Sequence, residues 1–179
     1  MERNLTLIAL FAALIAALGL VPKLMLASGV PISAQSMGIM LCGTVLGAKR
    51  GGLAVLLFLG LVALGLPLLA GGRGGIGVFS GPSMGYLIGF PVAAFVTGLL
   101  AEVWRSRGGF IFPAAAALVG GVIVLNVLGI VGMSIKLDKT LSEAAMLAMP
   151  FVPGDLIKAV LAGLITQGLL KARPGLAKA

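Results

Sequence analysis

The sequence contains no histidine and only one cysteine, Cys42, in 179 residues. Because histidine is the most common general base and metal ligand, its absence argues against hydrolase and zinc chemistry. A single cysteine can form neither an intramolecular disulfide nor a redox pair or metal cluster. Cys42 lies inside an apolar run, where we expect it to pack against other side chains. We therefore expect a chain that is not an enzyme and holds no metal.

Charged residues are also scarce. They make up 10% of the chain and hydrophobic residues 60%, whereas a soluble domain is about a quarter charged. This composition predicts a membrane protein of one domain, residues 1–179, with at most six or seven spans of about 20 residues. The formal net charge is +8, but the basic residues lie in short gaps between apolar runs and form no continuous stripe with aromatics. We therefore expect no nucleic-acid binding.

Six apolar segments follow one another, at residues 5–21, 35–47, 52–69, 85–104, 110–133 and 154–170. They predict an all-α membrane protein, a compact bundle of six transmembrane helices. The first segment follows Arg3 as in a signal peptide, but no clean cleavage site precedes a soluble region, so we interpret it as the first span. The second is short, so it must be tilted, partly interfacial or shielded by its neighbours.

The basic residues predict an orientation. If both termini are cytoplasmic, eight lysines and arginines face inward and four face outward, which is the bias typical of cytoplasmic loops. The inner set is Arg3, Lys49, Arg50, Arg105, Arg107, Lys171, Arg173 and Lys178, and the outer set is Lys23, Arg73, Lys136 and Lys139. We expect a multi-pass protein of the plasma membrane with cytoplasmic termini.

The predicted outer connections are long and irregular. Residues 70–85 are rich in glycine but also hold the apolar Ile76, Phe79 and Met84, unlike a flexible linker. Irregular backbone at membrane depth must be buried or face a water-filled cavity. We therefore expect this loop to fold back into the protein and to line a cavity. A capping-box pattern at Thr140 and Glu143 predicts a short helix that ends near Leu147.

Asp155 and Lys158 give the strongest signal for a binding site. They open the last apolar segment three residues apart, which places both on one face of a helix. Ionisable residues inside a span are costly and usually mark a substrate or ion path. The alternatives are an ion pair that only offsets its own burial, or shallow residues with Lys158 reaching toward the interface.

Weaker candidates surround that pair. Asn126 in the fifth segment could form the bottom of a pocket or a hydrogen bond between helices. Arg73 lies among glycines and could bind an anionic ligand through two hydrogen bonds, or be an ordinary exposed arginine. Tyr86, Gln35 and Ser33 could contact a ligand or lie at the membrane interface.

The glycine-rich loop is not an ATP-binding loop, because no Gly-Lys-Ser/Thr ends the run. Energy for transport must come from another protein or from an ion gradient. In the first segment, Ala9, Ala13 and Ala17 stand four residues apart. Small residues at this spacing allow close approach of another helix, which could belong to a partner protein or to the same bundle.

Several stretches together resemble one known family, the biotin-specific substrate-binding (S) components of energy-coupling-factor (ECF) transporters. The resemblance covers nearly the whole chain. One stretch, Pro31-Ile32-Ser33-Ala34-Gln35, departs from the usual threonine and leucine of the family but keeps a hydroxyl. The stretches are residues 30–35, 47–52, 65–67 with 71–75, 81–90 (Gly-Pro-Ser-Met-Gly-Tyr-Leu-Ile-Gly-Phe) and 153–158 (Pro-Gly-Asp-Leu-Ile-Lys).

The resemblance implies a prokaryotic six-helix S component without a cofactor that binds biotin near the outer surface, under the loops after the first and third helices. Asp155, Lys158 and Asn126 would hold the ureido end of biotin, and Arg73 with loop amides would face its carboxylate. The alanines of the first helix would contact a transmembrane (T) component that works with two cytoplasmic ATPases. The full set of expected binding residues is Asp155, Lys158, Asn126, Arg73, Tyr86, Gln35, Gly72 and Gly85.

Considered without the resemblance, Asp155 and Lys158 could also bind a ligand of this kind. Biotin carries two ureido N–H donors, a carbonyl acceptor, an apolar ring and chain, and a carboxylate. Ile76, Phe79 and Met84 could cover its apolar part. Two other hypotheses stay open: a stand-alone, ion-coupled secondary transporter of a small carboxylate, and a structural membrane protein without a ligand. The secondary-transporter hypothesis predicts uptake that survives loss of the ATPases. Secondary transporters are commonly built from internal repeats, which we do not find in this sequence.

Overall fold

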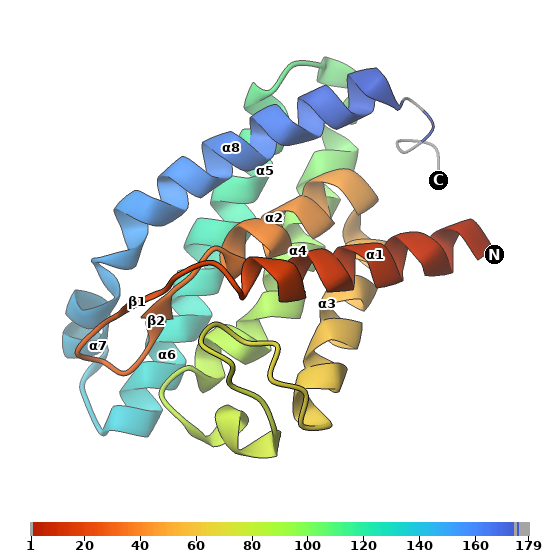
Figure 1. Ribbon diagram of the computed structural model, residues 1–179. Coiled ribbons are helices and arrows are strands. Elements are labelled where there is room, and N and C mark those ends of the chain that lie inside the picture. Colours follow the sequence, from red (N-terminus) through yellow and green to blue (C-terminus); the bar gives the residue numbers. More distant parts are fainter. Residues whose placement is uncertain (1, 174, 176–179) are drawn as a thin grey trace.

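The computed structural model describes residues 2–173 and 175, most of which are helical (Figure 1). A short hairpin, β1 (Leu24–Met25) with β2 (Pro31–Ile32), and two 3₁₀ turns, η1 (Ile76–Ser80) and η2 (Arg105–Arg107), connect the helices. In chain order the helices are α1 (Glu2–Leu18), α2 (Gln35–Leu46), α3 (Ala48–Ala63), α4 (Met84–Val103), α5 (Ile111–Ala117), α6 (Leu125–Leu137), α7 (Leu141–Ala148) and α8 (Phe151–Ala172).

The fifth predicted segment is one helical stretch with a π-helical section inside it. α5 passes into the π-helix η3 (Leu118–Val124), which passes into α6. Within the described residues, three stretches are long and apolar enough to cross a membrane: Met84–Arg107, Ile111–Leu137 and Phe151–Ala172. The helical, apolar character of the chain is therefore as predicted, whereas the number of spans and the side of the termini stay predictions.

α3 ends earlier than the hydropathy pattern predicts. The apolar run continues to residue 69, but the helix stops at Ala63. Gly65 has a φ of +107°, outside the helical region, and Pro67 has no N–H for a helical hydrogen bond. Residues 64–83 instead form a long loop, which returns to the bundle where the Gly75 N–H donates to the Val62 carbonyl at 2.8 Å.

α7 confirms the capping-box prediction. The Glu143 N–H donates to Thr140 Oγ1 at 3.3 Å, and the Thr140 N–H donates to Glu143 Oε2 at 2.8 Å. The helix ends at Ala148, one residue beyond the expected position. It packs against α6 and leads directly into α8.

The shortness of α2 has an explanation in its position. Eleven of its 12 residues are buried, because α1, α3, α4 and α8 all pack against it. A helix shielded by its neighbours need not match the bilayer thickness, so the third of the three options for this segment applies. At Gly43 an added Cβ would lie 2.6 Å from the Ala94 carbonyl oxygen, so the approach of α4 requires glycine there.

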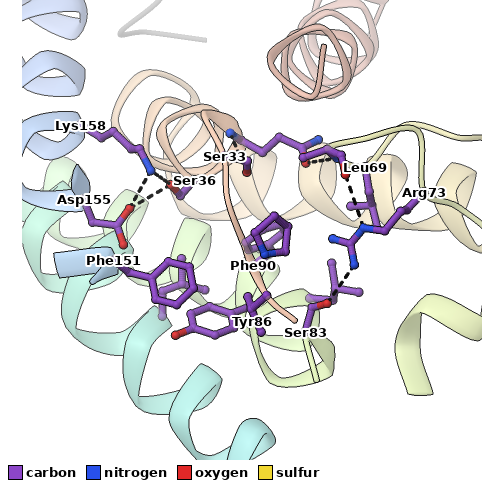
Figure 2. A pocket seen from close by; sticks show the side chains of 16 residues that line it. Ser33, Ser36, Leu69, Arg73, Ser83, Tyr86, Phe90, Phe151, Asp155 and Lys158 are labelled. Atoms are coloured by element: carbon purple, nitrogen blue, oxygen red, sulfur yellow. Dashed lines mark hydrogen bonds and ion pairs between the residues drawn. The ribbon is translucent and has the colours of Figure 1, made fainter. Parts of the chain in front are cut away.

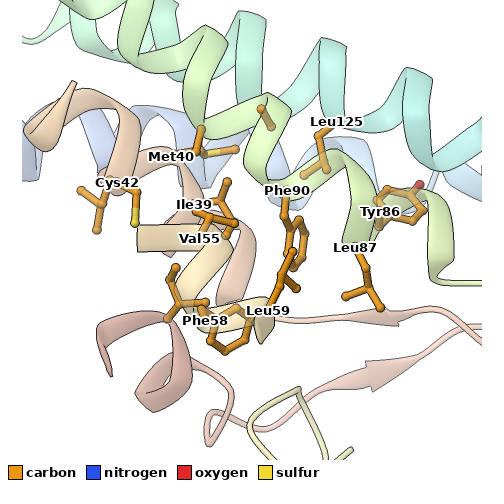
Figure 3. Packing of buried hydrophobic residues seen from close by; sticks show 14 of the residues in the cluster. Ile39, Met40, Cys42, Val55, Phe58, Leu59, Tyr86, Leu87, Phe90 and Leu125 are labelled. Atoms are coloured by element: carbon orange, nitrogen blue, oxygen red, sulfur yellow. The ribbon is translucent and has the colours of Figure 1, made fainter. Parts of the chain in front are cut away.

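The core fills the space between α2, α3, α4 and α6 (Figure 3). Ile39 and Met40 of α2, Phe58 of α3 and Leu125 of α6 are almost fully buried there. Phe90 of α4 belongs to this core and also lines the cavity described below. The core thus supports the central part of the cavity wall.

The start of α1 and the end of α8 lie on the same side of the molecule (Figure 1), and both carry basic residues. Arg3 and Arg173 line one surface hollow there, and Arg50 Nη1 donates to Asn4 Oδ1 at 3.3 Å. The opposite end, here called the loop end, carries β1, β2, α7 and residues 64–83. Lys178 of the expected inner set lies outside the described residues. We define the basic end by Arg3, Lys49, Arg50, Arg105, Arg107, Lys171 and Arg173.

Candidate functional site

A cavity opens at the loop end, between the start of α2, the start of α4, the start of α8 and the loop 64–83. Polar side chains stand at two sides of it and aromatic side chains lie between them (Figure 2). Its volume is about 50 Å³, so it is narrow in this form. The lining residues are Val30, Pro31, Ser33, Gln35, Ser36, Leu69, Ala70, Arg73, Ser83, Tyr86, Leu87, Phe90, Leu125, Phe151, Asp155 and Lys158.

Asp155, Lys158 and Ser36 form a hydrogen-bonded triangle on one side of the cavity (Figure 2). Lys158 Nζ lies 3.0 Å from Asp155 Oδ1 and donates to Ser36 Oγ at 3.0 Å, while the Ser36 hydroxyl donates to Asp155 Oδ1 at 3.1 Å. Both side chains of the ion pair are largely buried, with 16% of Lys158 and 6% of Asp155 exposed. Within the described residues these contacts use only Oδ1, so Asp155 Oδ2 can accept hydrogen bonds from a ligand.

The local sequence explains why this pair lies at the cavity. α8 begins at Phe151, and Pro153 is tolerated in its first turn because the N–H groups there have no helical acceptor. Asp155 and Lys158 follow three residues apart on one face of α8, and both contact Ser36 at the start of α2. Ser36 was not among the expected residues, and its only sequence signal was a hydroxyl at the polar start of an apolar segment.

Arg73 stands on the other side of the cavity (Figure 2). Its Nε donates to the Ala70 carbonyl at 3.4 Å, and Nη1 donates to Ser83 Oγ at 3.2 Å. Partial burial lowers the pKa of the Arg73 guanidinium from its ordinary value, yet an arginine keeps its charge at neutral pH. With two of its five N–H groups held by the loop, the guanidinium is oriented and can still donate to an anion.

Glycines shape the loop that carries Arg73. Gly71 and Gly72 have φ values of +80° and +69°, a region that glycine adopts without a steric cost. Gly72 forms this turn and does not belong to the cavity lining. The turn it forms carries Arg73 to the cavity wall, and a contact between the Gly72 amide and a ligand stays a prediction.

Gln35 lines the cavity, but its amide is engaged within the protein. Nε2 donates to the carbonyls of Ile15 at 3.1 Å and Leu68 at 3.0 Å, and the Ala70 N–H donates to Oε1 at 3.0 Å. The residue is only 2% exposed. Gln35 therefore joins the end of α1 to the Arg73 loop, and Ser33 supports it by accepting a bond from the Gln35 N–H at 3.3 Å.

Tyr86 and Asn126 form a second buried pair. The Tyr86 hydroxyl donates to Asn126 Oδ1 at 3.2 Å, and Asn126 Nδ2 donates to the Val122 carbonyl at 2.8 Å. Tyr86 lines the cavity, with its ring centroid 5.4 Å from that of Phe151, whereas Asn126 does not belong to the lining. Asn126 thus stands behind Tyr86 and fixes the direction of its hydroxyl.

Gly85 serves the contact between α4 and α6. An added Cβ would lie 2.7 Å from the Gly132 Cα and would also collide with the Leu128 carbonyl. The residue does not line the cavity. Its effect on the site is indirect, because close packing of the two helices brings Tyr86 next to Asn126.

The apolar part of the cavity differs from the expectation. Phe90 and Leu87 of α4, Leu125 of α6 and Phe151 of α8 supply it. Ile76 is instead 75% exposed, and Phe79 and Met84 do not line the cavity. Helix side chains therefore form the apolar wall of the cavity as it stands, and cover of a bound ligand by Ile76, Phe79 and Met84 stays a prediction.

Three alanines of α1 point away from the bundle. Ala9, Ala13 and Ala17 are exposed, while Ala12 is buried among the core residues. Packing inside the bundle, one of the two options for Ala9, Ala13 and Ala17, therefore does not apply to these exposed residues. We call Ala9, Ala13 and Ala17 the alanine face.

Comparison with known proteins gives concordant matches. A model described as the BioY family matches residues 2–175. The biotin transporter BioY of Rhodobacter capsulatus is 50% identical over 183 aligned positions, covering 97% of this chain and 96% of that protein. The biotin transporter BioY of Rhizobium etli is 46% identical over 178 positions, covering 96% and 95%. A crystal structure at 2.1 Å of the S-component for biotin from an ECF-type ABC transporter has a TM-score of 0.88 and 34% identity, covering 95% of this chain and 92% of that one.

Proposed function

The chain belongs to the BioY family, and from that premise we propose that it is the biotin-binding membrane subunit, the S component, of an ECF-type uptake transporter. The observation that carries the proposal is a cavity with a buried acid and base on one side and an oriented arginine on the other. Biotin has the matching order of groups: a ureido ring, an apolar ring and chain, and a carboxylate.

In this proposal the ureido ring lies against Asp155 and Lys158. Asp155 Oδ2 accepts a ureido N–H, and Lys158 donates to the ureido carbonyl. The apolar ring and chain lie between Phe90 and Phe151, and the carboxylate meets Arg73. A site built from buried polar groups rejects ligands that leave those groups unpaired, which gives selectivity for this vitamin.

Binding requires the cavity to widen. Its volume of about 50 Å³ is far below the 300 Å³ or more that is usual for a small-molecule pocket. The hairpin β1–β2 and the loop 64–83 contribute Pro31, Leu69 and Arg73 to the wall. These connections have few regular backbone hydrogen bonds, so we assign the opening movement to them rather than to the packed helices.

The proposal includes partners and a location. The chain lies in the plasma membrane as a six-span protein with cytoplasmic termini, and the alanine face of α1 contacts a T component that is coupled to two ATPases. The exposure of Ala9, Ala13 and Ala17 supports this contact, because small exposed residues allow a partner helix to approach closely.

The test of ligand binding is Asp155→Asn in the purified protein, measured by biotin titration calorimetry. Loss of the charge weakens its hydrogen bonds to the ureido group, and such bonds to a charged group contribute about 1.5–3 kcal/mol each. We expect biotin affinity to fall about 100-fold or more. The matched control is Asp138→Asn, the same change at the exposed end of α6, which should leave affinity unchanged. Equal affinity in both variants would remove Asp155 from the site.

An uptake assay tests the coupling. If the proposal holds, biotin uptake in cells stops when the genes for the partner ATPases are deleted and survives an ionophore at constant ATP. The ion-coupled alternative predicts the reverse pattern. Uptake that persists without the ATPases would therefore refute the energy source while leaving biotin binding, measured separately, intact.

A further inference from the structure

A second hollow lies at the basic end, between the last turn of α4, the start of α5 and the last turns of α8. Its volume is about 370 Å³. The cavity at the loop end, here called the biotin cavity, has a volume of about 50 Å³. Thr44 near the end of α2 lies at its floor, whereas Ser36 at the other end of α2 lines the biotin cavity. We call this hollow the α4–α8 groove, and its walls include Trp104, Arg105, Phe112, Thr166, Gln167, Leu170 and Lys171.

The rim of the groove is cationic. Arg105 and Lys171 line it, and the Arg107 guanidinium lies 5.6 Å from the centroid of the Phe112 ring, itself a wall residue. No aspartate or glutamate is among the described residues that line the groove. Glu102, one turn before Arg105, points to another surface, where it accepts the Ala48 N–H at 2.9 Å. The groove therefore favours an anion.

The walls and floor of the groove suit a hydrocarbon chain. The rings of Trp104 and Phe112 lie 6.5 Å apart, and Leu170 completes an apolar wall. On the floor, the hydroxyls of Thr44 and Thr166 are 2.7 Å apart and hydrogen-bond each other. Since these hydroxyls are already paired, an apolar chain can cover them without leaving a polar group unsatisfied.

We propose that the α4–α8 groove binds one anionic phospholipid. Its phosphate lies against Arg105 and Lys171, and one acyl chain lies along Trp104, Phe112 and Leu170. Tryptophan and basic residues are typical of the membrane–water interface, which places the groove at headgroup depth. Basic pockets between membrane helices recognise anionic headgroups in this way. The site is at the opposite end of α2 from the biotin cavity and does not depend on the proposed transport function.

The test compares lipids bound to the purified, delipidated chain, by native mass spectrometry and by melting temperature. We expect phosphatidylglycerol to bind and to raise the melting temperature more than phosphatidylcholine does, because a ligand of the folded state stabilises it. In the double variant Arg105→Gln/Lys171→Gln we expect about 30-fold weaker binding of phosphatidylglycerol, which is about 2 kcal/mol at about 1 kcal/mol per charge. Lys171→Gln alone, at an exposed residue, should weaken binding about fivefold.

The control variant is Lys136→Gln/Lys139→Gln, which removes two exposed charges at the loop end and should bind phosphatidylglycerol as the unaltered chain does. Without added lipid, all variants should keep the circular-dichroism spectrum of the unaltered chain, which verifies the fold. Equal binding of the two lipids, or equal loss in the groove and control variants, would overturn the proposal. Stabilisation by glycerol 1-phosphate as strong as that by the lipid would show a site for a soluble anion and would also overturn it.

Discussion

The side-chain amide of Gln35 is hydrogen-bonded within the protein. Replacement of Gln35 by alanine tests whether such a residue controls ligand binding through the loop that it holds. The change removes two hydrogen bonds donated by Nε2 and one accepted by Oε1. The Ile15 carbonyl keeps a bond from the Gly19 N–H at 3.2 Å, but the Leu68 carbonyl and the Ala70 N–H lose their side-chain partner. At about 1 kcal/mol for each hydrogen bond, and more for a buried group left unpaired, the local loss is about 2–3 kcal/mol.

The loss falls on the loop that positions Arg73, since the Ala70 carbonyl accepts from Arg73 Nε at 3.4 Å. We therefore expect biotin affinity to fall about 10- to 100-fold, because part of the binding energy must restore the loop. Hydrogen exchange should become faster in residues 66–73, while the core of α2 and α8 stays protected. This pattern separates a positioning role from a general loss of stability.

Two further variants sharpen the test. Gln35→Glu keeps an acceptor for Ala70 but places a carboxylate against the carbonyls of Ile15 and Leu68, so it should bind biotin no better than the alanine variant. Gln167→Ala, an amide at the other end of the bundle, is the control and should leave biotin affinity and loop exchange unchanged. Normal biotin affinity in Gln35→Ala, with or without faster exchange, would refute the reasoning.

Three other outcomes are expected. Arg73→Lys should weaken biotin binding about 10-fold or more but leave the affinity for biotin methyl ester nearly unchanged, because only the former has a carboxylate for the guanidinium; equal losses in calorimetry would place the carboxylate elsewhere. Ala13→Leu should abolish co-purification with the T component at unchanged biotin affinity, and an intact complex would contradict the role of the alanine face. Hydrogen bonds from Thr140 lower the pKa of Glu143 from its ordinary value of 4.5, so its stabilisation of α7 is present above that value and disappears as the pH falls through the lower folded value. Hydrogen-exchange protection factors of residues 141–148, which are corrected for the intrinsic pH dependence of exchange, should therefore fall as the pH drops through that folded value, and Glu143→Gln should remove this dependence; a pH dependence of the protection factors that persists in Glu143→Gln would assign it to another group.

Features that depend on neighbouring residues were predictable from the sequence. The capping box of α7 needs only Thr140 and Glu143, so the sequence alone locates that helix. The pairing of Asp155 with Lys158 needs only one turn of α8. The end of α3 was misplaced because hydropathy measures side chains, whereas the break at Gly65 is a property of the backbone.

Features that depend on contacts between distant segments were not predictable. Ser36 joins the Asp155 pair across 119 positions of sequence, and only the packing of α2 against α8 brings them together. Gln35 was expected at the ligand, but the positions of Leu68 and Ala70 turn it into a support for the loop. Asn126 was expected at the pocket bottom, and the approach of α4 places Tyr86 between it and the cavity.

The π-helical section of residues 118–124 has a consequence for how this chain can vary in evolution. A π-helical turn joins residue i to i+5 and so contains one residue more than an α-helical turn. A single deletion within Leu118–Val124 can return the segment to an α-helix while the flanking α5 and α6 keep their faces. A single deletion elsewhere in the same helix would rotate one part of the helix relative to the other, and would disturb the contacts with α4 at Asn126 or at Gly132. Length changes of one residue in this helix should therefore be confined to that section.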